Sequence, residues 1–493
     1  MTVHYFITSQ IDTYTSAIEI AEIQRLKLFD DLDQPAAIVT RNYVRDAAQV
    51  WNQLGISGRV INLFQYFQGS PDGPMPTTQA VLKQATDVPI ENNVGVVDGK
   101  TRVKVSTYGD ELYYIDYLDK WGFTDRRDFY DQNRLAYSEY FDDSSRLNSR
   151  IYYTQSGEPV LTFRYHGGPD NQAILSLIML YHQHQHLQFD DMDQLMAYFL
   201  DCLAQADPDP RFYSDREDVA VVPFQLMKQP AKRYIILHST FTTNAKRDGE
   251  FYPYVKKIAH MTDKLTGIIS STTAEAEDVH ARIPGTQSYT VPVSYIPNRQ
   301  FAKAFSTANR TPGQIIAVAR VTKLKQLDHI INIAIMLHQK LPEVDLKIYG
   351  YEDSTSDAKT VNHLHQMIKD QQADDYIHFC GYVQDLTEVY EDADVLALTS
   401  QFEGFSMAIL EALSHGCPVV SYDINYGPGE MVESGVNGEL VAADDIRSMY
   451  EKLLALLTNE DLLKTYSWQS MIPLNQFSED SVKADWLKVI EGV

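Results

Sequence analysis

The chain has 493 residues, of which 44% are hydrophobic, and its formal net charge is −25. This length suits two or three domains, and the apolar content excludes a disordered chain. A strongly acidic surface argues against nucleic-acid binding and against electrostatic docking on anionic lipid, because both need a basic surface.

The first ten residues, MTVHYFITSQ, contain the apolar run of a first β-strand and lack the basic start of a signal peptide. No stretch of about 18 apolar residues predicts a membrane span. The three cysteines, Cys202, Cys380 and Cys417, match no metal-site spacing, which favours a reduced compartment. We therefore expect a cytoplasmic protein and leave open a peripheral position at the inner face of the membrane.

Strand-like and helix-like patterns alternate over residues 1–65, with strands predicted at VHYFIT, AAIVT and RVINLF, and again from about residue 210. In the second of these regions the predicted strands are VAVVPFQ, RYIILHS, LTGIISST and SYTVPVSYIP. A further α/β unit begins near residue 314, and the tail 445–493 is predicted to be helical. Such alternation is typical of Rossmann-like domains built on parallel sheets.

Residues 76–200 have a different pattern. Of the 31 tyrosines, 11 lie between residues 100 and 185, and QSGEP separates two β-rich runs, which predicts a hairpin. We interpret this region as a β-rich insertion into the first α/β domain, and we expect it to serve acceptor binding or oligomerisation.

The predicted fold class is therefore α/β, with two Rossmann-like domains facing a cleft and a β-rich insertion in the N-terminal domain. The expected segments are 1–75 and 201–305 for the N-terminal domain, 76–200 for the insertion, and 306–493 for the C-terminal domain. In such sheets ligands bind beyond the carboxyl ends of the strands, so we expect the site in the cleft.

Two groups of candidate residues follow predicted strands. His238 ends RYIILHS, where it either faces the cleft or is an ordinary histidine at the edge of the core, and its spacing leaves both interpretations open. Arg320 and Lys325 follow QIIAVAR on one strand-to-helix loop. Both side chains suit a phosphate group, although a solvated basic loop is the alternative.

The stretch SQFEGFSMAILEALSHG, residues 400–416, places Glu403 in a loop and Glu411 in the following helix. Ser406 is the expected helix N-cap and Gly416 the expected end. Carboxylates accept hydrogen bonds from sugar hydroxyls, and a helix start attracts an anion. Together these features suit a nucleotide sugar, whereas two isolated glutamates would more often be surface residues.

Two other motifs carry less weight. His182, His184 and His186 alternate as in a strand, but no Cys or Asp cluster completes a metal site, so a solvated strand face is favoured. The stretch INYGPGEMVESGVNG, residues 424–438, fits no phosphate-binding or dinucleotide-binding fingerprint, and we expect its glycines to shape loops that line the cleft.

Three stretches of the chain together resemble the retaining glycosyltransferases of the GT-B fold, family 4. They are Glu403-Gly-Phe with Glu411, the upstream Arg320 and Lys325, and NYGPGEMVESGVNGELV. The tyrosine-rich insertion makes the chain similar to bacterial wall teichoic acid α-glycosyltransferases, of the poly(glycerol-phosphate) α-glucosyltransferase or TarM type. The O-GlcNAc transferases that act on secreted adhesins share this insertion.

The resemblance implies a role for each matching residue. Arg320 and Lys325 would bind the donor diphosphate, Glu403 would hold hydroxyls of the donor sugar, and Glu411 would bind the ribose. His238 would contact the sugar near the reacting carbon. The backbone around the motif would contact sugar and phosphate, at Gly404, Phe405 and Ser406. The resemblance implies no metal and no cofactor besides the UDP-sugar co-substrate.

One loop departs from the family pattern. The family carries glycines after the first strand, whereas this chain has no glycine before Gly55. Ser16 and Ala17 are the small residues that would take this place on the acceptor and donor side. A side chain at a position of close approach can clash, which puts acceptor binding in question.

The resemblance therefore predicts an enzyme that moves glucose or GlcNAc from a UDP-sugar to the poly(polyol phosphate) of wall teichoic acid. One alternative is transfer of GlcNAc to Ser or Thr of a secreted serine-rich adhesin. Another is a non-catalytic partner subunit of a paired glycosyltransferase. Expected partners are the UDP-sugar, a teichoic acid polymer or protein acceptor, and further subunits bound through the insertion, with no nucleic acid.

Overall fold

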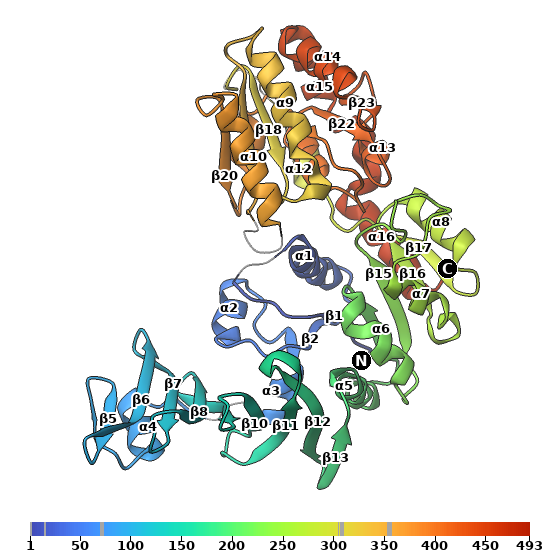
Figure 1. Cartoon of the computed structure of the whole chain (residues 1–493). Coiled ribbons are helices and arrows are strands. Elements are labelled where there is room, and N and C mark those ends of the chain that lie inside the picture. The colour runs from blue at the N-terminus through green and yellow to red at the C-terminus, as the bar shows by residue number, and fades with distance from the viewer. Residues whose placement is uncertain (1, 14–15, 70–72, 304, 306–309, 353–356) are drawn as a thin grey trace. The chain divides into compact units, whose positions relative to one another are not determined.

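The structure is a computed structural model that describes residues 2–13, 16–69, 73–303, 305, 310–352 and 357–493 (Figure 1). The chain divides into two compact units, residues 1–233 and 234–493. In the described ranges, no helix is long and apolar enough to cross a membrane. The finer division into four segments, with boundaries after residues 75, 200 and 305, stays a proposal.

The first unit contains four parallel strands in the order β14-β1-β2-β3. Every residue of β1 and β2 is buried, as expected for parallel strands with both faces covered, and this explains their largely apolar sequences. These strands are β1 (His4–Thr8), β2 (Ala36–Thr40), β3 (Val60–Asn62) and β14 (Arg211–Ser214), and the helices beside them in the sequence are α1 (Ala17–Asp31), α2 (Ala47–Gln53), α3 (Leu63–Gln68), α5 (Met192–Ala206) and α6 (Glu217–Leu226).

Two predicted strands of this unit are wrong in whole or in part. VAVVPFQ lies in helix α6, which begins with Glu217 and Asp218, and the strand of this region is β14. A short, fully apolar run has no period that separates a buried strand from a buried helix. RVINLF is a strand only to Asn62, whose side chain accepts from the N–H groups of Phe64 and Gln65 and so begins α3.

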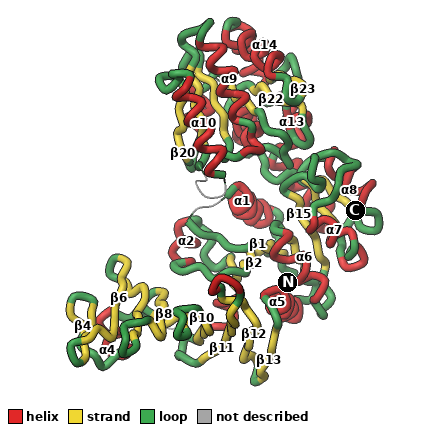
Figure 2. The backbone as a smooth tube through the Cα atoms, in the orientation of Figure 1, coloured by secondary structure: helices red, strands yellow, loops and turns green. Residues whose placement is uncertain are grey.

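The predicted β-rich insertion is a single antiparallel sheet of ten strands, β4 to β13, each paired with its neighbours in the sequence (Figure 2). Helix α4 (Thr78–Ala85) packs Val81 into a cluster with Val103 and Ile115. The strands are β4 (Ile90–Glu91), β5 (Val94–Val97), β6 (Lys100–Tyr108), β7 (Glu111–Leu118), β8 (Thr124–Asp131), β9 (Arg134–Phe141), β10 (Leu147–Tyr153), β11 (Pro159–Gly167), β12 (Ala173–His182) and β13 (Gln185–Phe189).

The tyrosine-rich composition is explained by cross-strand contacts in this sheet. The rings of Phe129 and Tyr137 stack 4.5 Å apart, and those of Tyr137 and Tyr152 lie 5.1 Å apart. Beside this aromatic row, Arg127 pairs with Asp116 at 2.5 Å. Pairs of this kind across neighbouring strands fix the register and stabilise the half-exposed face.

The second unit begins with three parallel strands, β15 (Lys232–Leu237), β16 (Gly267–Ser270) and β17 (Gln287–Thr290), with α7 (Pro253–Ala259) and α8 (Thr273–Arg282). A six-stranded parallel sheet of order β20-β19-β18-β21-β22-β23 follows. Its elements are β18 (Gln314–Val318), α9 (Leu327–His338), β19 (Asp345–Tyr349), α10 (Ala358–Asp370), β20 (Ile377–Gly381), α11 (Thr387–Asp392), β21 (Val395–Leu398), α12 (Met407–Ser414), β22 (Val419–Asp423), α13 (Pro428–Met431), β23 (Gly438–Ala442), α14 (Ile446–Leu457), α15 (Glu460–Gln469) and α16 (Glu479–Glu491).

Both faces of the six-stranded sheet are covered by helices. Ile315 and Ala317 of β18 belong to a core cluster with α9, α10 and α14, whereas the intervening Ile316 belongs to a second cluster with α11 and α12. In Figure 1, α9 and α10 lie next to each other over this sheet. The predicted Rossmann-like arrangement of this part of the chain is therefore confirmed.

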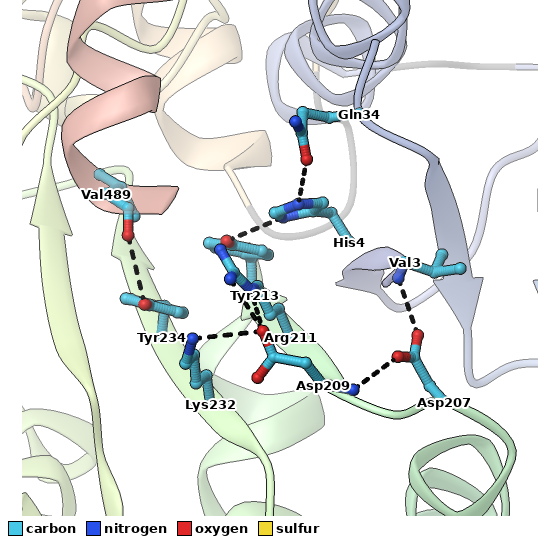
Figure 3. A network of polar contacts seen from close by, with 10 residues as sticks. All are labelled: Val3, His4, Gln34, Asp207, Asp209, Arg211, Tyr213, Lys232, Tyr234 and Val489. Carbon is cyan, nitrogen blue, oxygen red and sulfur yellow. Dashed lines mark hydrogen bonds and ion pairs between the residues drawn. The ribbon is translucent and has the colours of Figure 1, made fainter. Parts of the chain in front are cut away.

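A polar network lies at the start of β1 (Figure 3). The ring of His4 is fully buried, with Nδ1 3.0 Å from the Tyr213 hydroxyl and Nε2 3.3 Å from Gln34 Oε1. An amide oxygen only accepts, so the neutral ring carries its proton on Nε2 and accepts at Nδ1. Burial, with the nearby charge of Arg211, lowers the pKa of His4 to about 4. In the second unit, the Tyr234 hydroxyl donates to the Val489 carbonyl of α16 at 3.4 Å.

We expect His4 to make the fold acid-sensitive. Below pH 6.5 the unfolded chain takes up a proton at this histidine while the folded chain does not, so stability is lost as the pH falls toward about 4. Between pH 7 and pH 5 the free energy of unfolding of the wild type should fall by about 2 kcal/mol more than that of His4→Gln. Urea unfolding at both pH values measures this difference. The exposed His166→Gln variant is the control, and equal pH dependence in all three proteins would contradict the prediction.

Candidate active site

The predicted cations follow β18. Arg320 is exposed, and its guanidinium forms no hydrogen bond or ion pair with the described residues. Lys325 ends a 3-10 turn, η4 (Lys323–Lys325), and its Nζ lies 2.7 Å from Glu403 Oε1. Both cations thus lie beyond the carboxyl end of β18, as predicted, and Arg320 is available to an anionic ligand.

Glu403 follows the neighbouring strand, β21, which pairs in parallel with β18. Its Oε1 also accepts from the Ser400 hydroxyl at 2.6 Å, whereas its Oε2 has no hydrogen-bond partner within the described part of the chain. The Thr399 hydroxyl donates to the Lys325 carbonyl at 3.0 Å, which joins the two loops. The structure therefore brings Lys325 and Glu403 together and leaves one carboxylate oxygen for a ligand hydroxyl.

Gly404 permits a close approach between two distant segments of the second unit. A Cβ built on Gly404 would lie 2.4 Å from the His238 carbonyl oxygen and 2.9 Å from Ser239 Cα. These contacts are to backbone atoms, which cannot rotate away. The structure thus places the residue after Glu403 directly against His238, which follows β15 and is half-buried.

The two residues after Gly404 have structural side chains. Phe405 is 4% exposed and packs edge-to-face on Phe477. Ser406 takes the N-cap position of α12 in a left-handed conformation (φ 72°), and its hydroxyl makes no capping bond. The predicted N-cap position of Ser406 is therefore confirmed, but its side chain does not cap the helix, because such a cap needs an extended backbone at this residue. Contact of these two residues with a ligand stays a prediction.

Glu411 lies on α12 and is half-buried. Its Oε2 accepts from the Tyr390 hydroxyl at 2.9 Å. Burial raises the pKa of the Glu411 carboxyl above its ordinary value, and the hydrogen bond from Tyr390 partly offsets this effect. Tyr390 thus orients the carboxyl that the resemblance assigns to the ribose, and this ribose role stays a prediction.

Ser16 and Ala17 belong to the first unit. Ser16 is the N-cap of α1 in a capping box with Glu19, and Ala17 is the first helical residue. Both are exposed, and their predicted role beside the acceptor stays a prediction. Tyr14 and Thr15 of the same loop lie outside the described residues.

The histidine run does not form one strand face. His182 ends β12, His184 lies in the turn with φ 62°, and His186 lies in β13. The His182 ring bonds to the Tyr198 hydroxyl at 3.0 Å. Within the described ranges, no group of three His, Cys, Asp or Glu residues could hold a metal ion.

A cavity of about 460 Å³ in the first unit contains none of the predicted site residues. Its lining has two carboxylates and no cation, so it does not suit a diphosphate. The lining residues are Asp46, Ala48, Gln49, Asn52, Ser57, Met75, Glu111 and Gln132.

Residues 298–469 match the family model of glycosyl transferases group 1. This part of the chain is therefore similar to that family. The whole chain is 23% identical over 506 residues to the poly(ribitol-phosphate) α-N-acetylglucosaminyltransferase of Staphylococcus aureus, covering 99% of both chains. It is 25% identical to the UDP-N-acetylglucosamine–peptide N-acetylglucosaminyltransferase GtfA subunit of Streptococcus gordonii, covering 99% of this chain and 98% of the relative.

The glycosyltransferase also has a known fold. It superposes with a TM-score of 0.83 and 20% identity on a mutant of TarM from Staphylococcus aureus, solved with Fondaparinux, α-GlcNAc-glycerol and UDP, covering 99% of both chains. The α/β fold class, the GT-B fold and the β-rich insertion are therefore confirmed, as is the family resemblance read from the sequence.

The sequence did not indicate Ser400 as a partner of Glu403, or Tyr390 as a partner of Glu411. Ser400 follows β21 and lies three residues before Glu403, and this position after a predicted strand was a signal for it. Of the glycines of residues 424–438, Gly427 and Gly435 lie in turns, as predicted, whereas Gly429 lies in α13 and Gly438 begins β23. Gly427 has φ 95°, and a Cβ there would lie 2.0 Å from the Phe405 carbonyl oxygen.

Gly404→Ala should separate the Glu403 loop from His238. The added methyl group meets the backbone of His238 and Ser239, and overpacking of this kind costs about 1–3 kcal/mol. We expect donor turnover to fall about tenfold or more. Gly429→Ala is the matched control, because a Cβ there meets only Asp423 Oδ1 at 3.8 Å. Steady-state UDP release measures both variants, and equal activity in both would contradict the prediction.

Proposed function

We propose that the enzyme is a retaining α-glycosyltransferase that moves glucose or GlcNAc from a UDP-sugar to the poly(polyol phosphate) of wall teichoic acid. The observation that carries this proposal is the ion pair of Lys325 with Glu403 beyond the paired strands β18 and β21, with Arg320 exposed after the same strand β18. Cations that follow one strand and a carboxylate that follows its neighbour suit a diphosphate joined to a sugar.

The proposed chemistry uses these residues in separate roles. The acceptor oxygen forms a bond to the anomeric carbon on the face from which the diphosphate departs. Arg320 and Lys325 stabilise the charge that develops on the leaving diphosphate, and Glu403 holds sugar hydroxyls. The leaving phosphate oxygen takes the acceptor proton, so we assign no protein general base. His238 and the backbone of Gly404 face the sugar, and Glu411 holds the ribose.

No metal ion or further cofactor is assigned, because protein cations neutralise the leaving group in this proposal. We also propose a cytoplasmic location, with access to the inner face of the membrane. The choice of acceptor rests on the names of two relatives. One is named for transfer to poly(ribitol phosphate) and the other for transfer to peptide. Peptide transfer is therefore the second candidate.

We expect Glu403→Gln to lower donor turnover about 10- to 100-fold, because it removes a charged acceptor from the sugar and a partner from Lys325. The assay is UDP release with UDP-glucose and UDP-GlcNAc in parallel. Glu433→Gln, an exposed glutamate of the same unit, is the control. Unchanged turnover in Glu403→Gln would remove this residue from the donor site.

The same assay separates the acceptors. Stimulation of UDP release by poly(glycerol phosphate) or poly(ribitol phosphate), and not by a serine-rich peptide, supports the teichoic acid proposal. Stimulation by the peptide alone supports the second candidate. No release with either donor would favour a non-catalytic partner subunit.

We further propose that the insertion joins subunits. The turn between β7 and β8 exposes Trp121 and Phe123, which are 73% and 61% exposed. If they lie in an interface, replacing both with serine should lower the mass per particle in light scattering. Trp468→Ser is the control, since Trp468 is 66% exposed on α15. The same mass for all three proteins would rule out these two residues as subunit contacts.

A further inference from the structure

The backbone of Glu403 is held by a short segment, residues 425–427. The Glu403 N–H donates to the Asn425 carbonyl at 3.1 Å, and the Tyr426 N–H donates to the Glu403 carbonyl at 2.6 Å. Gly427 packs on the Phe405 carbonyl. Both backbone polar groups of Glu403 are thus bound to this segment, so its position fixes the origin of the Glu403 side chain.

The 425–427 segment is itself anchored by two side chains. The Tyr426 ring is 2% exposed and lies parallel to Phe241, and its hydroxyl donates to Asp278 Oδ2 at 2.9 Å. Asn425 Nδ2 donates to the Ala245 carbonyl at 2.8 Å. Asp278 is on α8 and Ala245 is on the loop that follows β15 and His238. The segment therefore connects the Glu403 loop to the region that carries His238.

A buried tyrosine bonded to a carboxylate often serves stability alone. Here, however, the anchored segment contacts a residue that is assigned to the donor sugar. The backbone of Lys325, which is assigned to the diphosphate, is held differently: Lys325 lies on η4, which is joined to Thr399 and Gln401. Only the Lys325 side chain contacts Glu403, at 2.7 Å. A shift of the segment should therefore affect recognition of the sugar and change recognition of the diphosphate little.

We propose that Tyr426 and Asn425 are positioning residues that place Glu403 against the donor sugar, through Asp278 and Ala245; this rests on the proposed function. Their loss weakens binding of the UDP-sugar and leaves UDP binding unchanged. A residue that served only the stability of the fold would affect the two ligands alike.

The test compares full-length wild type with Tyr426→Phe by calorimetric titration of UDP and of the UDP-sugar that the wild type turns over. We expect the UDP-sugar Kd to rise about tenfold and the UDP Kd to stay within about twofold. In steady-state assays the donor kcat/KM should fall by the same factor as the UDP-sugar affinity, while product inhibition by UDP stays unchanged.

The chain offers a matched control. Tyr466 is 3% exposed, and its hydroxyl donates to Glu439 Oε1 at 2.6 Å. Tyr466→Phe removes the same kind of bond in the same unit. Within the described part of the chain this hydroxyl bonds to Glu439 and not to residues 425–427, so the variant should leave both affinities unchanged.

Asp278 supplies a second pair of variants. Asp278→Asn keeps an acceptor oxygen for Tyr426 and should retain UDP-sugar binding, whereas Asp278→Ala should behave as Tyr426→Phe does. Arg247 lies 3.6 Å from Asp278 and is 62% exposed, so loss of that pair should matter little.

Two results would overturn the positioning role: wild-type UDP-sugar affinity in Tyr426→Phe and Asp278→Ala, or an equal loss of UDP and UDP-sugar binding in both. A wild type that binds neither UDP nor UDP-sugar would overturn the proposed function itself. The two failures are therefore distinguishable, because the first requires a wild type that binds its donor.

Discussion

The close backbone contact between Gly404 and His238 is the constraint on which the site depends. It joins two segments that are far apart in the sequence, and it is possible only because residue 404 has no side chain. Gly427 makes the same kind of contact with the Phe405 carbonyl on the other side. The turn that carries Glu403 is therefore held between two backbone segments, and its position follows from packing rather than from its own sequence.

The functional groups of this turn are divided between two kinds of support. The Glu403 carboxylate is oriented by Lys325 and Ser400, which lie on the loops after the paired strands. Its backbone is held by residues 425 and 426. Side-chain orientation and backbone position are thus fixed by different parts of the same unit, which restricts Glu403 more than either support does alone.

The elements whose structure depends on local sequence could be predicted from the local sequence pattern. The strand QIIAVAR, the helix after it and the positions of Lys325 and Glu403 at strand ends could be predicted because apolar periodicity fixes these elements and parallel strands align their carboxyl ends. The helix VAVVPFQ was mistaken for a strand because its apolar run has no polar face. The bond between Tyr426 and Asp278 spans 148 residues, and a glycine-rich stretch gave no sign of a buried tyrosine. Long-range pairing of this kind has no local signal.

The exposed guanidinium of Arg320 also affects how a ligand arrives. With a net charge of −25, the protein repels an anionic nucleotide at long range, and attraction begins only close to a cation such as Arg320. At physiological ionic strength, charges further apart than about 8 Å are largely screened. Salt therefore weakens the long-range repulsion more than it weakens a direct contact. Added salt should therefore speed the approach of an anionic ligand to this enzyme, the reverse of the usual effect for a basic binding site.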